Sequence, residues 1–532
     1  MAWGALAAGI KIVTSYPGSP SSGTVEVLIE LAKEHNLYVE WSTNEKVAME
    51  MGIGASIAGR RALVCVKSVG LNVMIDPLMA LNLTPLNAGL VILLGDDPGG
   101  YGSQNDQDSR PLACLLEMPM MEPATPPEAY AMMQEAFEVS EKYQVAVIIR
   151  ETRSFTRQTE SVEIAAEPYE QIDMGLVREP YRFVPVPINA VTKHQALHET
   201  LDALIDWGNG TAYNRIYGTG DKGIVGGGFA YQKIRDLIGD DQPKNFRLLK
   251  LGNLYPLPAK VITQFLKDCR EILIVEENSP FLEIHIKALA QEIGWWGKIY
   301  GKQSGHLPQA GEMYRWQIQL ALIQFMPGFV PVKDCRQENE SAEKPQKEGF
   351  CRDCRYDEVL DKLAEAAASL GKKPVIIGDP GCLVTVAERL DAKYALGSAV
   401  AVADGLSKAG CPEPVVAMFG DSAFFHTTLP ALCNAVYNRS DILMVVLDNK
   451  ATVTSGFQPN PGVGKDACGN PAPQLDIERI ARACGVKNVF PSDLDDTDGA
   501  LDETFRKALN QPDLTMVIVR IKKKKHDHQT HA

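Results

Sequence analysis

The chain has 532 residues, of which 45% are hydrophobic and 23% charged, a composition ordinary for a globular protein of about three domains. Its net charge of −14 argues against a nucleic-acid or anionic-membrane surface, because such surfaces need clustered Lys and Arg. No apolar run reaches the ~20 residues of a membrane span, and the apolar start lacks the basic segment of a signal peptide. A cytoplasmic location is therefore expected.

The first segment, residues 1–165, alternates short apolar runs with helical patterns. The runs IKIVTSY, RALVCV, GLVILLG and VAVIIR are typical of buried parallel strands. The stretches NEKVAMEMGIGASIAG and PEAYAMMQEAFEVSEKY are typical of helices. This alternation predicts an α/β domain with a parallel sheet.

The rest of the chain repeats this pattern. Residues 175–333 and 351–523 are each predicted to form a further α/β domain, separated by a polar linker over residues 334–350 and followed by a tail, 524–532. The fold class is thus α/β, with three doubly wound domains and mainly parallel sheets. The triple glycine at 226–228 departs from the G-x-G-x-x-G pattern at Tyr231, so a tight strand-to-helix turn is favoured over a nucleotide site.

Polar side chains follow two expected strands of the third domain. One strand ends in Gly420-Asp421-Ser422, and the next ends in Asp448-Asn449, with Asn449 standing 28 residues after Asp421. The carboxyl ends of such strands are where open α/β sheets bind ligands. Asp421, Asn449 and the backbone carbonyl of Ala451 would supply the oxygen ligands that Mg²⁺ or Ca²⁺ prefers. A Gly-Asp-Ser run alone could equally be an ordinary strand-to-turn signal.

The spacing of Asp421 and Asn449 is the pattern of thiamine-diphosphate enzymes, in which the helix after Gly420 would aim its N–H groups at a diphosphate. Such enzymes also need a Glu that hydrogen-bonds the pyrimidine ring of the cofactor. Glu45 follows an expected strand and opens a helix that also carries Glu50. Periodicity cannot separate these two residues, and an exposed Glu in the first helical turn is the ordinary alternative for either.

Motifs along almost the whole length resemble the α subunits of the indolepyruvate:ferredoxin oxidoreductases, within the 2-oxoacid:ferredoxin oxidoreductase family. The motifs are SYPGSPSS, NEKVAMEMGIGA, GLNVMIDPLM and SQNDQDSR in the first domain, LGNLYPLPAKV, IVEENSPFLE and GKQSGHLP in the second, and CRDC, GDPGC, GDSAFFHTTLPALCNAVYN and DNKATVTSGFQPNPG in the third. The resemblance implies a pyrimidine-binding domain, a transketolase-C-terminal-like domain and a diphosphate-binding domain, in that order.

The resemblance also implies roles for particular residues. It selects Glu45 as the pyrimidine partner and places Ser19 near the 2-oxoacid. It places Gly381 and Cys382 beside the diphosphate and thiazolium, with Ser422 and Gly420 in the metal loop. His426 would contact the substrate or an intermediate, although a histidine that packs the helix start is an equally good interpretation.

The implied reaction is oxidative decarboxylation of an aryl 2-oxoacid, with electrons leaving through iron–sulfur clusters and CoA taking the acyl group. A homodimer, a smaller partner subunit and an external electron carrier are implied as well.

The cysteines depart from the family pattern. Cys351, Cys354 and Cys382 match three ligands of a [4Fe–4S] cluster, which needs four. The fourth expected position falls in VIVRIKKKK, which holds no Cys, and leaves Cys468 and Cys484 as substitutes. The local CRDC also replaces the family's CPGC, and we expect the chain to lack the family's C-terminal ferredoxin-like domain.

Two mechanistic classes therefore stay open. One is the catalytic subunit of a 2-oxoacid oxidoreductase. The other is a non-oxidative thiamine enzyme, a decarboxylase or acyl/aldehyde transferase, that has lost electron transfer. A non-catalytic relative is disfavoured because Glu45, Asp421 and Asn449 are all present.

Overall fold

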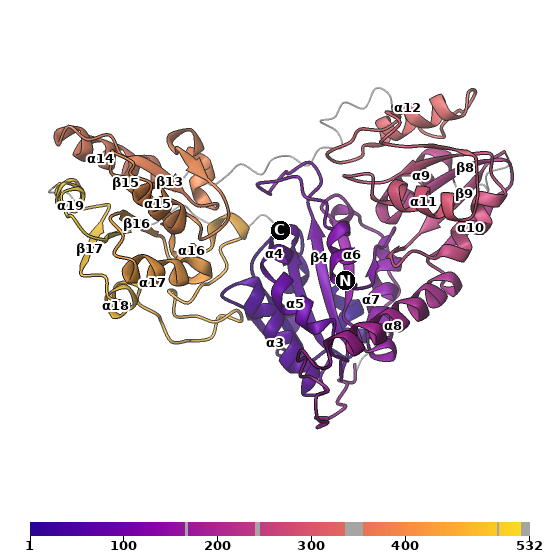
Figure 1. The fold of residues 1–532 in the computed structure, drawn as a ribbon, viewed down its shortest axis with the longest axis horizontal. Coiled ribbons are helices and arrows are strands. Elements are labelled where there is room, and N and C mark those ends of the chain that lie inside the picture. Colours follow the sequence, from indigo (N-terminus) through magenta and orange to yellow (C-terminus); the bar gives the residue numbers. More distant parts are fainter. Residues whose placement is uncertain (165–168, 240–244, 336–354, 497–498, 523–532) are drawn as a thin grey trace. The chain divides into compact units, whose positions relative to one another are not determined.

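The computed structural model describes the chain except residues 165–168, 240–244, 336–354, 497–498 and 523–532 (Figure 1). It divides into two compact units, residues 1–346 and 347–532, and each is described by itself. Most of the expected linker and all of the expected tail lie outside the described residues. None of the described helices is long and apolar enough to cross a membrane.

The first unit contains two sheets. The first has the strand order β10-β5-β6-β4-β3-β1-β2. Its strands are β1 (Ile12–Ser15), β2 (Tyr38–Trp41), β3 (Ala62–Lys67), β4 (Leu90–Asp96), β5 (Met120–Met121), β6 (Val147–Thr152) and β10 (Asn253–Tyr255). All pairs are parallel except β10 with β5.

Helices cover both faces of this sheet. They are α1 (Ala2–Ala7), α2 (Ser22–Leu31), α3 (Glu45–Ile57), α4 (Ser68–Val73), α5 (Ile75–Leu81), α6 (Arg110–Leu116) and α7 (Pro126–Tyr143). Alternate residues of a strand point to opposite faces, so Val64 and Ile92 pack in one core cluster with α3, α4, α5 and α6. Leu63 and Val91 pack in another with α1, α2 and α7. Figure 1 shows α3, α4 and α5 together on one side of β4.

The second sheet has the order β12-β11-β8-β9-β7 and is parallel except for β7 with β9. Its strands are β7 (Arg215–Gly218), β8 (Lys222–Gly227), β9 (Arg247–Leu251), β11 (Glu271–Val275) and β12 (Lys298–Tyr300). The accompanying helices are α8 (Ala190–Gly210), α9 (Gly228–Ile238), α10 (Ala259–Lys267), α11 (Phe281–Glu292) and α12 (Arg315–Phe325). Since β10 belongs to the first sheet, the chain returns to that sheet from within this part, and the two sheets form one unit.

The triple glycine forms the predicted strand-to-helix turn. β8 ends at Gly227 and α9 begins at Gly228, which has a φ of +46°. A Cβ on Gly228 would come within 2.2 Å of the Glu122 carboxyl group, which accepts a hydrogen bond from the Phe229 N–H at 3.2 Å. Glycine is therefore required here by close packing against a buried carboxylate rather than by a nucleotide.

The second unit is a single parallel sheet with the order β14-β13-β15-β16-β18-β17. Its strands are β13 (Val375–Gly378), β14 (Ala392–Lys393), β15 (Val415–Gly420), β16 (Leu443–Asp448), β17 (Asn488–Asp493) and β18 (Thr515–Arg520). Its α-helices are α14 (Tyr356–Ser369), α15 (Ala399–Lys408), α16 (Asp421–Ala423), α17 (Leu429–Tyr437), α18 (Ile477–Ala483) and α19 (Ala500–Leu509). The predicted α/β class with mainly parallel sheets is confirmed.

A buried ion network joins the two sheets of the first unit. Arg110, at the start of α6, donates to Asp108 Oδ2 at 2.7 Å and to Glu276 Oε2 at 2.8 Å, and all three side chains are almost fully buried. Burial alone would raise the pKa of Asp108, but the Arg110 guanidinium lowers it to about 2. Arg110 thus neutralises carboxylates contributed by both sheets.

Replacing Arg110 with Met is expected to destabilise the first unit by about 3–5 kcal/mol, because Asp108 and Glu276 would stay buried without a cation. Urea unfolding followed by tryptophan fluorescence measures this loss, since all six Trp lie within residues 1–346. The exposed Arg178 gives the matched control, Arg178→Met. Equal midpoints for the two variants would contradict a stabilising role of the network.

Candidate functional site

The carboxyl edge of the third sheet brings the predicted metal ligands together. β13, β15 and β16 are neighbours, and β15 pairs with β16 in a register that sets Gly420 opposite Leu447. Asp421, which follows β15, and Asp448, the last residue of β16, therefore lie at the same level of this edge. α16 begins at Asp421, so the helix follows β15 without an intervening loop.

Asp421 is buried and held by polar neighbours. Its Oδ2 accepts from Asn460 Nδ2 at 2.9 Å, and its Oδ1 accepts from the Ser422 N–H at 3.0 Å. Burial raises the pKa of Asp421 to about 7. The nearby charge of Asp448 raises this pKa further, whereas the hydrogen bond from Asn460 lowers it. Hydrogen bonds thus hold the Asp421 carboxylate in place. Among the described residues, no salt bridge to this carboxylate is found.

Asn449 and Ala451 occupy a tight turn after β16. Asn449 Oδ1 accepts from the Ala451 N–H at 3.1 Å, while its Nδ2 donates to the Tyr356 hydroxyl at 3.1 Å. Lys450 between them has a φ of +57° and pairs with Asp448 Oδ2 at 2.9 Å. The turn thus fixes the amide of Asn449 beside the strand-end that carries Asp448.

These residues fit a divalent cation. Asp448 Oδ1 is buried and has no hydrogen-bond partner among the described residues, and the ionised form of Asp421 is disfavoured by burial. Among the described residues, Lys450 is the cation paired with Asp448, and its charge also acts on Asp421. Carboxylate and amide oxygens are the donors that Mg²⁺ takes, and a bound cation would offset the excess negative charge.

The loop after β13 carries the GDPGC motif. Asp379 is buried and accepts from the N–H groups of Gly397 at 2.8 Å and Ala399 at 2.8 Å, at the start of α15. Burial raises the pKa of Asp379 to about 7, although these hydrogen bonds and the charge of His426 act in the opposite direction. Asp379 thus orders this loop. No role for this residue was predicted from the sequence.

Gly381 and Cys382 follow in the same loop. Gly381 has a φ of +106°, a region that residues with a Cβ rarely adopt, and it leads into the 3₁₀ segment Cys382–Arg389. His426 lies in the π-helical segment Phe424–Thr428, is buried, and its Nδ1 lies 3.2 Å from Thr427 Oγ1. π-Segments are frequent at functional sites, and both interpretations of His426 stay open.

In the first unit, Glu45 is buried where α3 follows β2. The N-cap Asn44 accepts from the Val47 N–H at 2.9 Å, which fixes the start of the helix. A Cβ on Gly70 would come within 2.8 Å of Glu45 Oε1, so a glycine there leaves room for the carboxylate. Glu50 instead is exposed and pairs with Lys46.

Ser19 lies exposed in the turn after β1. Near it is a residue that sequence reasoning missed, Lys67, whose side chain lies within 2.8 Å of where a Cβ on Gly18 would be. Burial lowers the pKa of Lys67, against the attraction of Asp97 and Glu45. Lys67 ends the apolar run RALVCVK, and a lone cation at a strand terminus was the signal available in the sequence.

The predicted cluster cysteines are placed only in part. Cys351 and Cys354 lie outside the described residues, and Cys382 is half-buried at the start of its 3₁₀ segment. Of the substitute ligands, Cys468 is exposed, and Cys484 lies with its Sγ 3.9 Å from that of Cys433.

Comparison with known proteins identifies two cofactor domains. Residues 3–197 match the family described as pyruvate flavodoxin/ferredoxin oxidoreductase, thiamine diphosphate-binding. Residues 390–519 match the thiamine pyrophosphate enzyme, C-terminal TPP-binding domain. Both matches support thiamine diphosphate as the cofactor, whereas the predicted bounds and roles of the domains stay a prediction.

Relatives that align with almost the whole chain are indolepyruvate oxidoreductase subunits. The chain is 34% identical over 550 residues to the indolepyruvate oxidoreductase subunit IorA of Pyrococcus abyssi, covering 97% of this chain and 83% of the relative. It is 34% identical over 533 residues to that of Methanothermobacter marburgensis, covering 97% and 84%. A solved 2-oxoglutarate:ferredoxin oxidoreductase from Magnetococcus marinus aligns at 13% identity with a TM-score of 0.41, over 56% of this chain and 60% of that one.

Asp379→Asn is expected to remove a pH dependence of local stability. Because the folded pKa of about 7 exceeds the ordinary value of 3.8, the folded loop binds the proton more tightly, and its stability falls as pH rises from about 4 to about 7. Amide hydrogen exchange at Gly397 and Ala399, corrected for intrinsic rates, should show less protection at about pH 8 than at about pH 5 in the wild type. An equal pH slope in the Asn variant would contradict this assignment.

Proposed function

The chain belongs to the indolepyruvate oxidoreductase IorA family of thiamine-diphosphate-dependent 2-oxoacid oxidoreductases, and we propose that it catalyses oxidative decarboxylation of an aryl 2-oxoacid, such as indolepyruvate, to an acyl-CoA. The observation that carries the proposal is the pair of ligand-bearing strand ends, Asp421 after β15 and Asn449 after β16, in the matched cofactor domain.

Asp421, Asn449 and the Ala451 carbonyl would hold Mg²⁺, which in turn would hold the diphosphate. The buried, excess negative charge at Asp421 and Asp448 supports this role. Gly420 and Ser422 shape the turn that presents Asp421, and Ser422 Oγ lies 2.8 Å from Thr452 Oγ1, which ties the two loops together. Gly381 and Cys382 would line the same cofactor from the neighbouring strand β13.

Glu45 would hydrogen-bond the pyrimidine ring. When bound, thiamine diphosphate would supply a nucleophilic carbon and a thiazolium ring that accepts the electron pair left by decarboxylation. Glu45 would hold the proton on the ring nitrogen that this activation requires. Its burial at the start of α3, with Gly70 packed against it, keeps the carboxylate in one place.

Ser19 and Lys67 would bind the 2-oxoacid. Both lie at the carboxyl edge of the first sheet, after β1 and at the end of β3. A half-buried ammonium group is suited to a carboxylate because desolvation strengthens their attraction. His426, in the second unit, would contact the substrate or an intermediate and is the least constrained of the proposed catalytic residues.

The remaining assignments concern partners. We propose a cytoplasmic homodimer that works with a smaller subunit, CoA and an external electron carrier. Cys351, Cys354 and Cys382 would hold a [4Fe–4S] cluster with a fourth ligand from elsewhere. The alternative is a non-oxidative decarboxylase or acyl/aldehyde transferase, favoured by the Lys run that stands where the fourth Cys is expected.

Glu45→Gln is expected to bind thiamine diphosphate with near wild-type affinity but to lose turnover of indolepyruvate by at least ~100-fold, since the amide cannot take part in proton transfer. Calorimetric binding and CO₂ release measure the two effects separately. Glu50→Gln, on the exposed side of the same helix, is the control. If Glu50→Gln is the inactive variant, the assignment of Glu45 is wrong.

Anaerobically purified protein is expected to be brown, with broad absorption at roughly 400 nm and about four irons per chain. Iron analysis and the visible spectrum measure this directly, and Cys382→Ser should lower both. Colourless, iron-free protein that releases CO₂ from an aryl 2-oxoacid without an electron acceptor would instead establish the non-oxidative alternative.

A further inference from the structure

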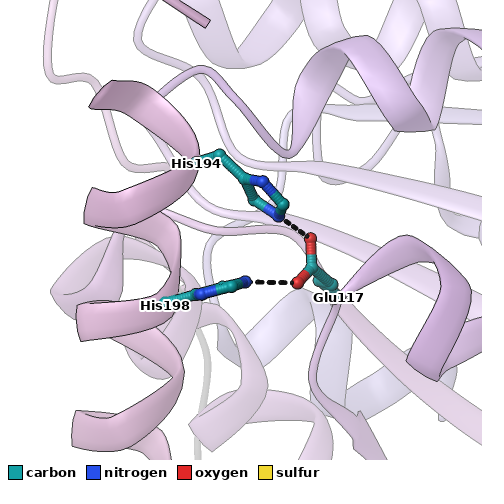
Figure 2. A group of neighbouring side chains, drawn as sticks. All are labelled: Glu117, His194 and His198. Carbon is teal, nitrogen blue, oxygen red and sulfur yellow. Dashed lines mark hydrogen bonds and ion pairs between the residues drawn. The ribbon is translucent and has the colours of Figure 1, made fainter. Parts of the chain in front are cut away.

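Two histidines of α8 face a glutamate at the end of α6, and none of the three is a residue of the proposed cofactor site. His194 and His198 lie four residues apart on α8, and Glu117 is the residue that follows Leu116, the last of α6. Figure 2 shows both imidazoles directed at the one carboxylate. All three belong to the first unit.

The geometry brings three ligand atoms together. His194 Nε2 lies 2.6 Å from Glu117 Oε2, and His198 Nε2 lies 2.8 Å from Glu117 Oε1. The three ligand atoms lie within 4.8 Å of one another. Residues four apart on a helix share one face, so both imidazoles can reach a common point without any change in the backbone.

The surroundings allow an ion to enter. The His194 and His198 side chains are 48% and 58% exposed, and that of Glu117 is 22% exposed. Glu117 has a φ of +50°, and this turn points its carboxylate back towards α8. Half-exposed side chains can rotate to the ligand distances of about 2.0–2.2 Å that Zn²⁺ requires.

The donor set selects the kind of ion. Two imidazole nitrogens and one carboxylate oxygen suit Zn²⁺ and neighbouring transition ions, whereas Mg²⁺ and Ca²⁺ favour oxygen ligands alone. Three protein ligands also leave a position for water, as in three-ligand zinc sites.

We propose that Glu117, His194 and His198 form a Zn²⁺ site that fastens α8 to the end of α6. α8 precedes β7, the first strand of the second sheet, while α6 packs on the first sheet. A metal bridge between them would therefore stiffen the connection from one sheet to the other. This site does not depend on the proposed reaction.

Other residues of the chain could bind zinc and must be separated from the site. His526, His528 and His531 lie in the C-terminal tail, and several thiols are half-buried or exposed. The test therefore uses the full chain with the three tail histidines replaced by Ala. In this background Zn²⁺ is titrated by calorimetry, and Co²⁺ is added in parallel to show by its spectrum whether thiolates take part.

The background protein is expected to bind one Zn²⁺. The affinity for this ion should fall by more than about tenfold, or binding should be lost, in Glu117→Gln, His194→Gln and His198→Gln. The controls are Glu199→Gln, which replaces an exposed carboxylate on α8, and His306→Gln. Both should bind Zn²⁺ with the affinity of the background protein. Zn²⁺ should also raise the melting temperature of the background and not of the His194→Gln/His198→Gln variant, while the two melt alike without metal.

Three results would overturn the proposal. They are no Zn²⁺ binding by the background protein, equal affinity in Glu117→Gln and His198→Gln, or a Co²⁺ spectrum with thiolate bands that is unchanged in the histidine variants.

Discussion

The parallel pairing of β15 with β16 determines where the proposed metal ligands lie. Once Gly420 lies opposite Leu447, the residues that follow must leave the sheet side by side, and Asp421 meets the loop of Asp448 and Asn449. No local preference of Asp or Asn would achieve this alone, because the two residues are 28 positions apart. The hydrophobic strands thus do the positioning, and the polar residues at their ends are the proposed metal ligands.

Ionisable groups at these strand ends are kept at a cost to stability. Burial raises the pKa of Asp379 and of Asp421 to about 7, so each carboxylate would fold more favourably as a neutral acid. By contrast, Arg110 neutralises Asp108 and Glu276 and joins the two sheets of the first unit. Arg110 thus pairs two structural carboxylates, whereas burial disfavours the charge of Asp421, where a metal ion is proposed to bind.

The sequence predicts the sheets and the strand ends well, because short apolar runs bounded by turn residues indicate buried parallel strands. It also places Asp421 and Asn449 correctly at neighbouring strand ends, and the turn at Gly228 is as expected. Lys67 was missed although a lone cation at a strand end was visible, but the sequence could not reveal Asp379 or the Glu117–His194–His198 group. Their significance depends on burial or on contacts between residues far apart in the chain, which spacing does not encode.

The central claim is that Asp421 holds the metal ion through which thiamine diphosphate binds. Calorimetric titration of the apo protein with thiamine diphosphate, with and without Mg²⁺, tests it most directly in the wild type and in Asp421→Ala. We expect Mg²⁺-dependent binding in the wild type and no detectable binding in the variant, with both proteins folded. Equal affinity in the two proteins would contradict it.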